Sequence, residues 1–173
     1  MATHQVRTRP PRSDSREPPV IAFRTDEVSG YLEDAAHYPG GHASAVAFPR
    51  DEAQLASLIR ENATVLPVGA QSSLTGGATP MGEVVLNLSK LIAIAEPAAE
   101  QITVQPGVTM THLRETLTAI DKCYPPVPTY EGATVGGVVS TNAAGAATFK
   151  YGTTRQWVRA LTVMLASGDV LDL

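Results

Sequence analysis

Two uncharged, glycine-rich segments contain the residue types best suited to binding a ligand. The first spans residues 69–77 with the sequence GAQSSLTGG, and the second spans 132–145 with the sequence GATVGGVVSTNAAG. A glycine backbone can approach a ligand closely and adopt positive φ, and successive N–H groups then form a concavity that binds an anion. Serine and threonine hydroxyls in both segments add further donors. The pattern predicts a phosphate or diphosphate site formed by amides and hydroxyls, without lysine.

Each segment could also be an ordinary turn of glycine and small polar residues. One such segment alone would favour the turn, whereas two that each follow the end of a predicted element favour a ligand site. The common nucleotide motifs are absent, because no glycine precedes a Lys-Ser or Lys-Thr pair in P-loop spacing and no G-x-G-x-x-G occurs. A P-loop NTPase and a plain Rossmann domain are therefore disfavoured.

Short apolar strands and amphipathic helices alternate around these segments and must position them. Strands are expected at 44–48, 64–68, 83–88, 102–105, 158–166 and 170–173. Helices are expected at 51–62 and 109–120, where Asp51 and Thr109 are suitable N-caps and apolar residues recur on one face. The proline-rich run 124–128 is expected to be an extended loop. The first glycine-rich segment thus begins directly after a strand.

Composition predicts a globular domain over residues 20–173, preceded by a disordered tail over residues 1–19 that is rich in proline and charge. The net charge of −4 gives no electrostatic footprint for nucleic acid. No apolar stretch suits a secretory signal or a transmembrane segment, so the expected compartment is cytoplasmic. Cys123 is the only cysteine, which excludes a disulfide framework, and the four histidines show no metal-binding spacing.

Three ordered motifs resemble the vanillyl-alcohol-oxidase type flavoproteins, which carry a PCMH-type FAD-binding domain. The motifs are PVGAQSSLTGGATP at 67–80, VQPGVTMTHL at 104–113, and the long stretch at 124–171 that contains GATVGGVVSTNAAG and YGTTRQWV. The branch they resemble most contains D-lactate dehydrogenase, the FAD subunit of glycolate oxidase, and D-2-hydroxyglutarate dehydrogenase. This sequence departs from the branch at Ala70 and Gln71, which replace two glycines of the first motif.

The resemblance implies an α+β fold of two α/β lobes with FAD between them, incomplete at the C-terminus. It assigns cofactor contacts to Gly69, Ala70, Gln71, Ser72, Ser73, Gly76, Pro106, Gly107, Thr134, Gly136, Gly137, Thr141, Asn142, Gly145, Tyr151 and Gly152. Residues 69–73 are expected to cradle the diphosphate through backbone N–H groups. Thr134 is expected to begin a helix whose N-terminal end faces a phosphate or the flavin edge.

The cofactor is expected to be non-covalent FAD, because neither glycine-rich segment contains a histidine or cysteine that could attach it. The resemblance implies an FAD-dependent oxidoreductase that oxidises a small 2-hydroxy acid of the D-lactate or glycolate type. The family continues beyond residue 173, and its catalytic and metal-binding residues lie in that part, so no catalytic or metal residue is assigned here.

Two alternatives remain open. The first is a non-catalytic FAD-binding or partner-docking fragment that requires a complementary C-terminal chain. The second is an activity like that of alkyl-dihydroxyacetonephosphate synthase, which involves no net redox change.

Overall fold

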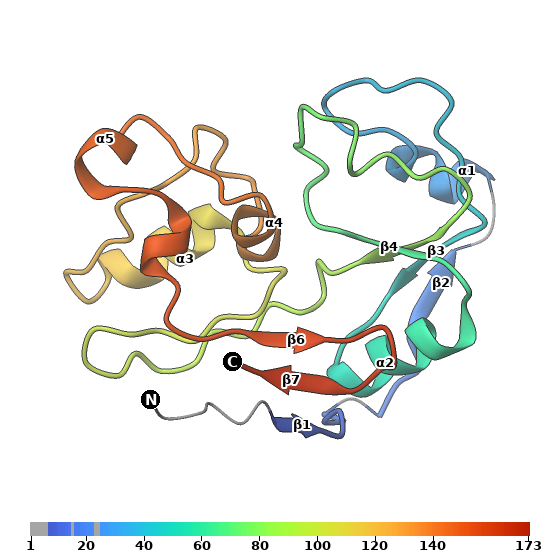
Figure 1. The fold of residues 1–173 in the computed structure, drawn as a ribbon, viewed down its shortest axis with the longest axis horizontal. Coiled ribbons are helices and arrows are strands. Elements are labelled where there is room, and N and C mark those ends of the chain that lie inside the picture. The colour runs from blue at the N-terminus through green and yellow to red at the C-terminus, as the bar shows by residue number, and fades with distance from the viewer. Residues whose placement is uncertain (1–6, 15, 23–24) are drawn as a thin grey trace.

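The computed structural model describes residues 7–14, 16–22 and 25–173. Figure 1 shows two lobes, with the four-stranded sheet and helices α1 and α2 on the right and helices α3, α4 and α5 on the left. A three-stranded sheet lies below both lobes and contains the last strand of the chain. The expected α+β fold is confirmed. No helix among the described residues is both long enough and apolar enough to cross a bilayer.

The first lobe is built on a sheet with strand order β2-β3-β5-β4. Its strands are β2 (Val20–Ala22), β3 (Ala45–Phe48), β4 (Val65–Val68) and β5 (Val84–Asn87). Strands β3, β4 and β5 are parallel and β2 is antiparallel. Val46 and Val85 pack on one face of the sheet with α1 (Thr25–Val28) and η1 (Ser29–Tyr31), whereas Ala47 and Leu86 pack on the other with α2 (Glu52–Glu61).

The predicted helix 51–62 is confirmed, and its start is fixed by the expected cap. The Asp51 carboxylate accepts a hydrogen bond from the Gln54 N–H at 2.8 Å, as an N-cap side chain should. Leu58 is buried against the sheet, and Leu55 and Ile59 pack beside it. The periodic apolar face therefore identified the side of α2 that covers the sheet.

Pro67 lies inside β4, one residue before the end of the strand. A proline is tolerated there because β4 lies at the edge of its sheet, where a residue can lack an N–H. The parallel neighbours β4 and β5 are joined by residues 69–83, which contain no regular helix. The first glycine-rich segment is thus part of a crossover connection, an arrangement that usually holds a helix.

The second lobe is formed by α3 (Met110–Thr118), α4 (Val135–Ser140), α5 (Thr148–Tyr151) and η2 (Thr154–Trp157). Val108, Leu113 and Val138 belong to its buried core. Thr109 caps α3 as expected. The strand expected at 102–105 is not regular, because this segment makes only the isolated bridge Ile94↔Val104.

The three-stranded sheet corrects the prediction of a disordered tail over residues 1–19. Strand β1 (Arg7–Arg9) pairs antiparallel with β7 (Val170–Asp172), which in turn pairs with β6 (Thr162–Met164). Strand β6 is shorter than the predicted 158–166, and the predicted return strand is confirmed. Part of the tail is ordered because its backbone covers one side of β7, while residues 1–6 and 15 lie outside the described residues.

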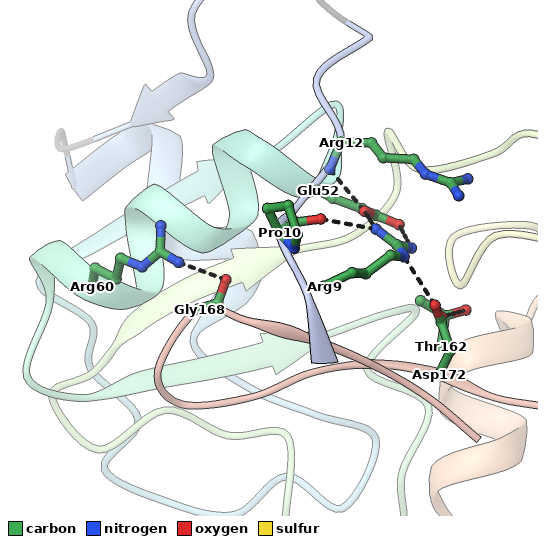
Figure 2. Close-up of polar contacts among 8 residues, drawn as sticks. All are labelled: Arg9, Pro10, Arg12, Glu52, Arg60, Thr162, Gly168 and Asp172. Carbon is green, nitrogen blue, oxygen red and sulfur yellow. Dashed lines mark hydrogen bonds and ion pairs between the residues drawn. The ribbon is translucent and has the colours of Figure 1, made fainter. Parts of the chain in front are cut away.

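Arg9 fastens this terminal strand to the first lobe. Figure 2 shows its guanidinium between Glu52 at the start of α2 and Asp172 in β7. Arg9 makes a bidentate pair with Glu52, at 2.6 and 2.9 Å, and donates from Nε to Asp172 at 2.9 Å. Arg60 in α2 donates to the carbonyl of Gly168 at 2.9 Å, in the turn between β6 and β7. The hairpin is therefore held against α2 at both ends.

We expect Arg9→Met to lower stability at neutral pH and to have little effect in acid. The hydrogen bond from Arg9 holds the pKa of Glu52 below its ordinary value of 4.5, and hydrogen bonds from Thr162 and Arg9 hold the pKa of Asp172 below 3.8. A carboxyl group whose pKa is lower in the folded state stabilises above its ordinary pKa and loses that contribution as pH falls through the folded value. The difference in urea midpoint between wild type and variant should therefore be largest near pH 7 and shrink below about pH 4.

Arg159→Met is the matched control, because Arg159 is exposed and forms no ion pair within the described part of the chain. It should unfold like the wild type at both pH values. An Arg9→Met difference that stays equal from pH 7 to pH 3 would show that the ion pairs do not stabilise the fold.

Candidate functional site

The first glycine-rich segment starts at the carboxyl edge of the parallel strands. Strand β4 ends at Val68, whose carbonyl accepts a hydrogen bond from the Leu88 N–H at 3.0 Å, just beyond the end of β5. Gly69 follows Val68 directly. The carboxyl ends of parallel strands are where open α/β sheets bind ligands, because the connections leaving that edge surround a crevice. The sheet topology therefore places this segment where a cofactor is expected.

Gly69 brings the first segment into contact with the second. A Cβ atom on Gly69 would lie 2.1 Å from Thr134 Oγ1, which is far inside van der Waals contact. Thr134 is buried, and its hydroxyl accepts from the Gly137 N–H at 3.4 Å, so it has little freedom to move away. The two segments approach this closely because residue 69 has no side chain.

A third predicted segment joins them through backbone hydrogen bonds. The Pro106 carbonyl accepts from the Gly136 N–H at 2.9 Å, and the Val108 carbonyl accepts from the Val135 N–H at 2.8 Å. A Cβ on Gly107 would lie 2.1 Å from the Leu88 carbonyl oxygen. The predicted residues of the 69, 106–107 and 134–137 segments are therefore brought together in the folded chain.

The first segment presents a row of backbone donors. In the part of the chain that the structure describes, the N–H groups of Ala70, Gln71, Ser72 and Ser73 donate no hydrogen bond to another protein group, and the Ser72 hydroxyl is likewise unpaired. Ala70 is exposed and the next three residues are half-buried. Adjacent amides without an internal acceptor are the donor set that an anionic oxygen requires.

The N-terminal end of helix α4 differs from the expectation that it offers free donors to a phosphate or to the flavin edge. Its start at Thr134 is as predicted, but the N–H groups of Val135 and Gly136 are occupied by the carbonyls of Val108 and Pro106, and the Gly137 N–H is occupied by the Thr134 hydroxyl. These amides hold the protein together and are not available as donors to a phosphate. The cofactor contacts expected of Thr134, Gly136 and Gly137 stay a prediction. Because these amides are occupied, the contacts would come from close approach of the backbone to the cofactor.

The remaining predicted residues lie in the second lobe and are held by separate contacts. Thr141 donates to the Gly137 carbonyl, and the Asn142 side chain accepts from the Arg155 N–H. A Cβ on Gly145 would lie 2.0 Å from the Val127 carbonyl oxygen. Tyr151 and Gly152 follow in α5 and at its C-terminus, where Gly152 has φ of 79°. None of the hydrogen bonds described for these residues reaches the 69–77 segment.

Two supporting side chains were not identified from the sequence. Asp34 is 3% exposed and accepts from the N–H of Ala78, directly after the first glycine-rich segment, although no local pattern separates it from a surface carboxylate. Thr154 is 2% exposed and donates to the Ala143 carbonyl at 2.6 Å, while Tyr124 Oη lies 2.8 Å from Thr154 Oγ1. Burial raises the pKa of Tyr124. Thr154 belongs to the YGTT motif, and that motif was the feature of the sequence from which this residue could have been identified.

Two cavities of about 360 and 200 Å³ lie elsewhere in the first lobe. Both are lined by Ile21 and Leu58, between β2 and α2. No predicted site residue lines either cavity, so the candidate site is defined by its donors and close contacts.

Comparison with known proteins tests what this arrangement binds. The model of the FAD binding domain family matches residues 43–173, which include all three convergent segments. The chain belongs to the FAD binding domain family. FAD is therefore the cofactor of this domain.

Relatives and solved structures agree with the family. The chain is 39% identical over 125 residues to a D-lactate dehydrogenase of Anaerostipes hadrus, covering 70% of this chain and 26% of that protein. It is 31% identical to the glycolate oxidase subunit GlcD of Bacillus subtilis, covering 82% of this chain and 32% of that protein. A solved alkyldihydroxyacetonephosphate synthase superposes with a TM-score of 0.76 at 14% identity, covering 86% of this chain and 31% of that structure. This likeness confirms the PCMH-type fold.

By name these relatives are a D-lactate dehydrogenase and a glycolate oxidase subunit, and the FAD-binding domain of this chain is related to them in sequence. The chain spans about a quarter to a third of the length of the relatives it matches.

Proposed function

We propose that this chain is the FAD-binding module of an oxidoreductase that oxidises a 2-hydroxy acid of the D-lactate or glycolate type. The observation that carries the proposal is the row of four unpaired amides, from Ala70 to Ser73, at the carboxyl edge of the sheet. The names of the relatives supply the substrate class. When bound, FAD would supply the two-electron redox chemistry that converts a 2-hydroxy acid to a 2-oxo acid.

The residues of this chain bind and orient the cofactor. The amides of residues 70–73 and the Ser72 hydroxyl would donate to the diphosphate oxygens. Gly69 permits the backbone to lie against Thr134, so that the first loop and α4 form adjoining walls of the site. Because the chain matches only part of each relative, the groups that hold the hydroxy acid are proposed to come from the remainder of the enzyme.

Binding is proposed to be non-covalent. The 69–77 and 132–145 segments contain no histidine or cysteine, and those are the side chains expected to attach the flavin. Cys123 is exposed and lies outside both segments. Acid precipitation should therefore release the flavin into the supernatant.

Titration of the purified chain with FAD tests the proposal directly. We expect the flavin fluorescence to change saturably and the urea midpoint to rise with FAD concentration, because a ligand that binds only the folded state stabilises it. Riboflavin, which has no diphosphate, should bind more weakly. A chain that is folded by circular dichroism and shows neither a fluorescence change nor a shift in midpoint would refute the assignment.

The substrate class requires a second measurement, because an error in the substrate class is independent of an error in the FAD assignment. The chain joined to the remaining part of its enzyme should reduce a dye acceptor with D-lactate or glycolate. Reduction by neither hydroxy acid, in a protein that holds FAD, would reject the substrate and leave the cofactor assignment intact.

A further inference from the structure

The loop that carries the free amides has no regular structure of its own, so something else must hold it. Residues 69–78 leave β4 and return toward β5 without a helix. A loop that samples many conformations binds its ligand weakly, because the apparent dissociation constant rises as the binding-competent fraction falls. The contacts that fix this loop therefore contribute to cofactor affinity even where they touch no cofactor.

Asp34 holds the far end of this loop. Its carboxylate is buried, with Oδ2 accepting from the Ala78 N–H at 3.2 Å and Oδ1 accepting from the Ala36 N–H at 3.1 Å. Its own N–H donates to the hydroxyl of buried Thr79 at 3.2 Å. A buried carboxylate stays satisfied only while such donors remain in place. Asp34 thus connects the segment before β3 to the end of the loop.

Gln71 holds the beginning of the loop and contacts the same segment before β3 that contains Asp34. Its Nε2 donates to the Tyr31 carbonyl at 3.0 Å and to the Ala78 carbonyl at 2.9 Å, while its own carbonyl accepts from the Ala35 N–H at 2.9 Å. Its φ of 48° lies in the left-handed region, which is uncommon for a residue with a side chain. The protein thus holds both the side chain and the carbonyl of Gln71, while its N–H donates to no group in the described part of the chain.

Gln71 replaces a glycine of the family motif, and its contacts show what the replacement adds. The resembled motif has glycine here, which adopts positive φ without strain but leaves the loop flexible. Glutamine accepts the strained backbone and adds two hydrogen bonds, one to Ala78 that ties the two ends of the loop together and one to Tyr31 outside the loop. The tip is packed as well, because Gly76 lies against the Tyr38 ring, where a Cβ would be 3.1 Å from ring atoms.

We propose that Asp34 and Gln71 are positioning residues that fix the 69–78 loop with its amides arranged for the FAD diphosphate. The inference rests on the proposed function, because it needs FAD at this loop. Neither side chain contacts the cofactor in this scheme, and both act through the backbone that they hold. Their effect should accordingly depend on whether the ligand carries the diphosphate.

Asp34→Asn is the sharpest test, because it keeps the shape and replaces one acceptor oxygen with an NH₂ group that opposes a backbone N–H. Asp51→Asn is the matched control. Asp51 is also buried, and its carboxylate also accepts two backbone N–H groups, from Gln54 at 2.8 Å and Asp14 at 3.0 Å, but it caps α2 on the opposite face of the sheet. Gln71→Gly is the second variant, since it removes the side-chain bonds and keeps the backbone conformation accessible.

We expect Asp34→Asn and Gln71→Gly to raise the dissociation constant for FAD by at least about tenfold, as when the competent fraction of the loop falls to about one tenth. The affinity for riboflavin should be unchanged. Asp51→Asn should lose stability in urea and bind both ligands like the wild type. Hydrogen exchange without FAD should accelerate at residues 70–78 in the first two variants only, which reports on loop order independently of the cofactor.

Four results separate the possible failures. Wild-type FAD affinity in Asp34→Asn and Gln71→Gly would overturn the inference, and so would an equal loss for FAD and riboflavin. Unchanged exchange at residues 70–78 would show that the two side chains do not hold the loop. A wild-type chain that binds no FAD would refute the proposed function itself, and the inference would fall with it even if exchange had accelerated.

Discussion

Gly107→Ala is expected to destabilise the chain by at least about 3 kcal/mol, toward the upper end of the cost of overpacking. A Cβ at this position would lie 2.1 Å from the Leu88 carbonyl oxygen and 2.8 Å from that of Leu91. Both obstacles are backbone atoms, and the Gly107 N–H donates to the Leu91 carbonyl at 2.8 Å. The residue cannot move away without breaking that bond. The urea midpoint at neutral pH measures the loss.

Gly77→Ala is the control for this substitution. The nearest atom to a Cβ on Gly77 is Thr75 Oγ1 at 3.6 Å, an ordinary contact, and its φ is not positive. Stability should change by less than about 1 kcal/mol. If Gly107→Ala unfolded at the same urea concentration as Gly77→Ala, the close packing of Gly107 would not be essential to the fold.

Thr154→Val is expected to cost about 2–6 kcal/mol, because it leaves two polar groups without partners at about 1–3 kcal/mol each. The Ala143 carbonyl can only accept, so the Thr154 hydroxyl donates to it at 2.6 Å and accepts from Tyr124 at 2.8 Å. Valine has nearly the same shape, but its side chain can neither donate nor accept a hydrogen bond. The second glycine-rich segment includes Ala143, so it should also become more mobile, which hydrogen exchange at residues 143–147 would detect.

Thr116→Val provides the comparison for Thr154. Thr116 donates to the His112 carbonyl at 2.9 Å on the exposed surface of α3, where water can replace the bond. Its loss should stay within about 0.5 kcal/mol. Equal stability of the two variants would mean that the buried Tyr124–Thr154–Ala143 chain contributes nothing to the fold.

Local signals predicted the elements that depend on neighbouring residues. Asp51 and Thr109 each accept from the N–H three positions ahead, so their helices could be located from short sequence patterns. Strand β1 depends instead on a partner at the other end of the chain, since Arg9 and Asp172 are 163 positions apart. A polar, proline-rich tail contains no local evidence of such pairing. The segment at 102–105 shows the reverse case, with strand-like residues that make only one isolated bridge.

The glycines in and near the predicted site serve different purposes. The run from Ala70 to Ser73 supplies unpaired donors, whereas Gly107, Gly136 and Gly145 are required because backbone or proline atoms of the protein itself lie too close for a side chain. Sequence spacing cannot distinguish a glycine that faces a ligand from one that faces its own chain. The same limit hid Asp34, whose importance depends on a loop more than forty positions away.

Strand β1 has a practical consequence for recombinant work. A version shortened to begin at Val20 follows naturally from the composition of the tail, but it would remove Arg7–Arg9 and expose the hydrogen-bonding groups along one side of β7. Exposed strands of this kind recruit strands from other molecules and promote aggregation. An insoluble product from such a truncation would reflect the missing strand, so the natural tail belongs in any expression plasmid.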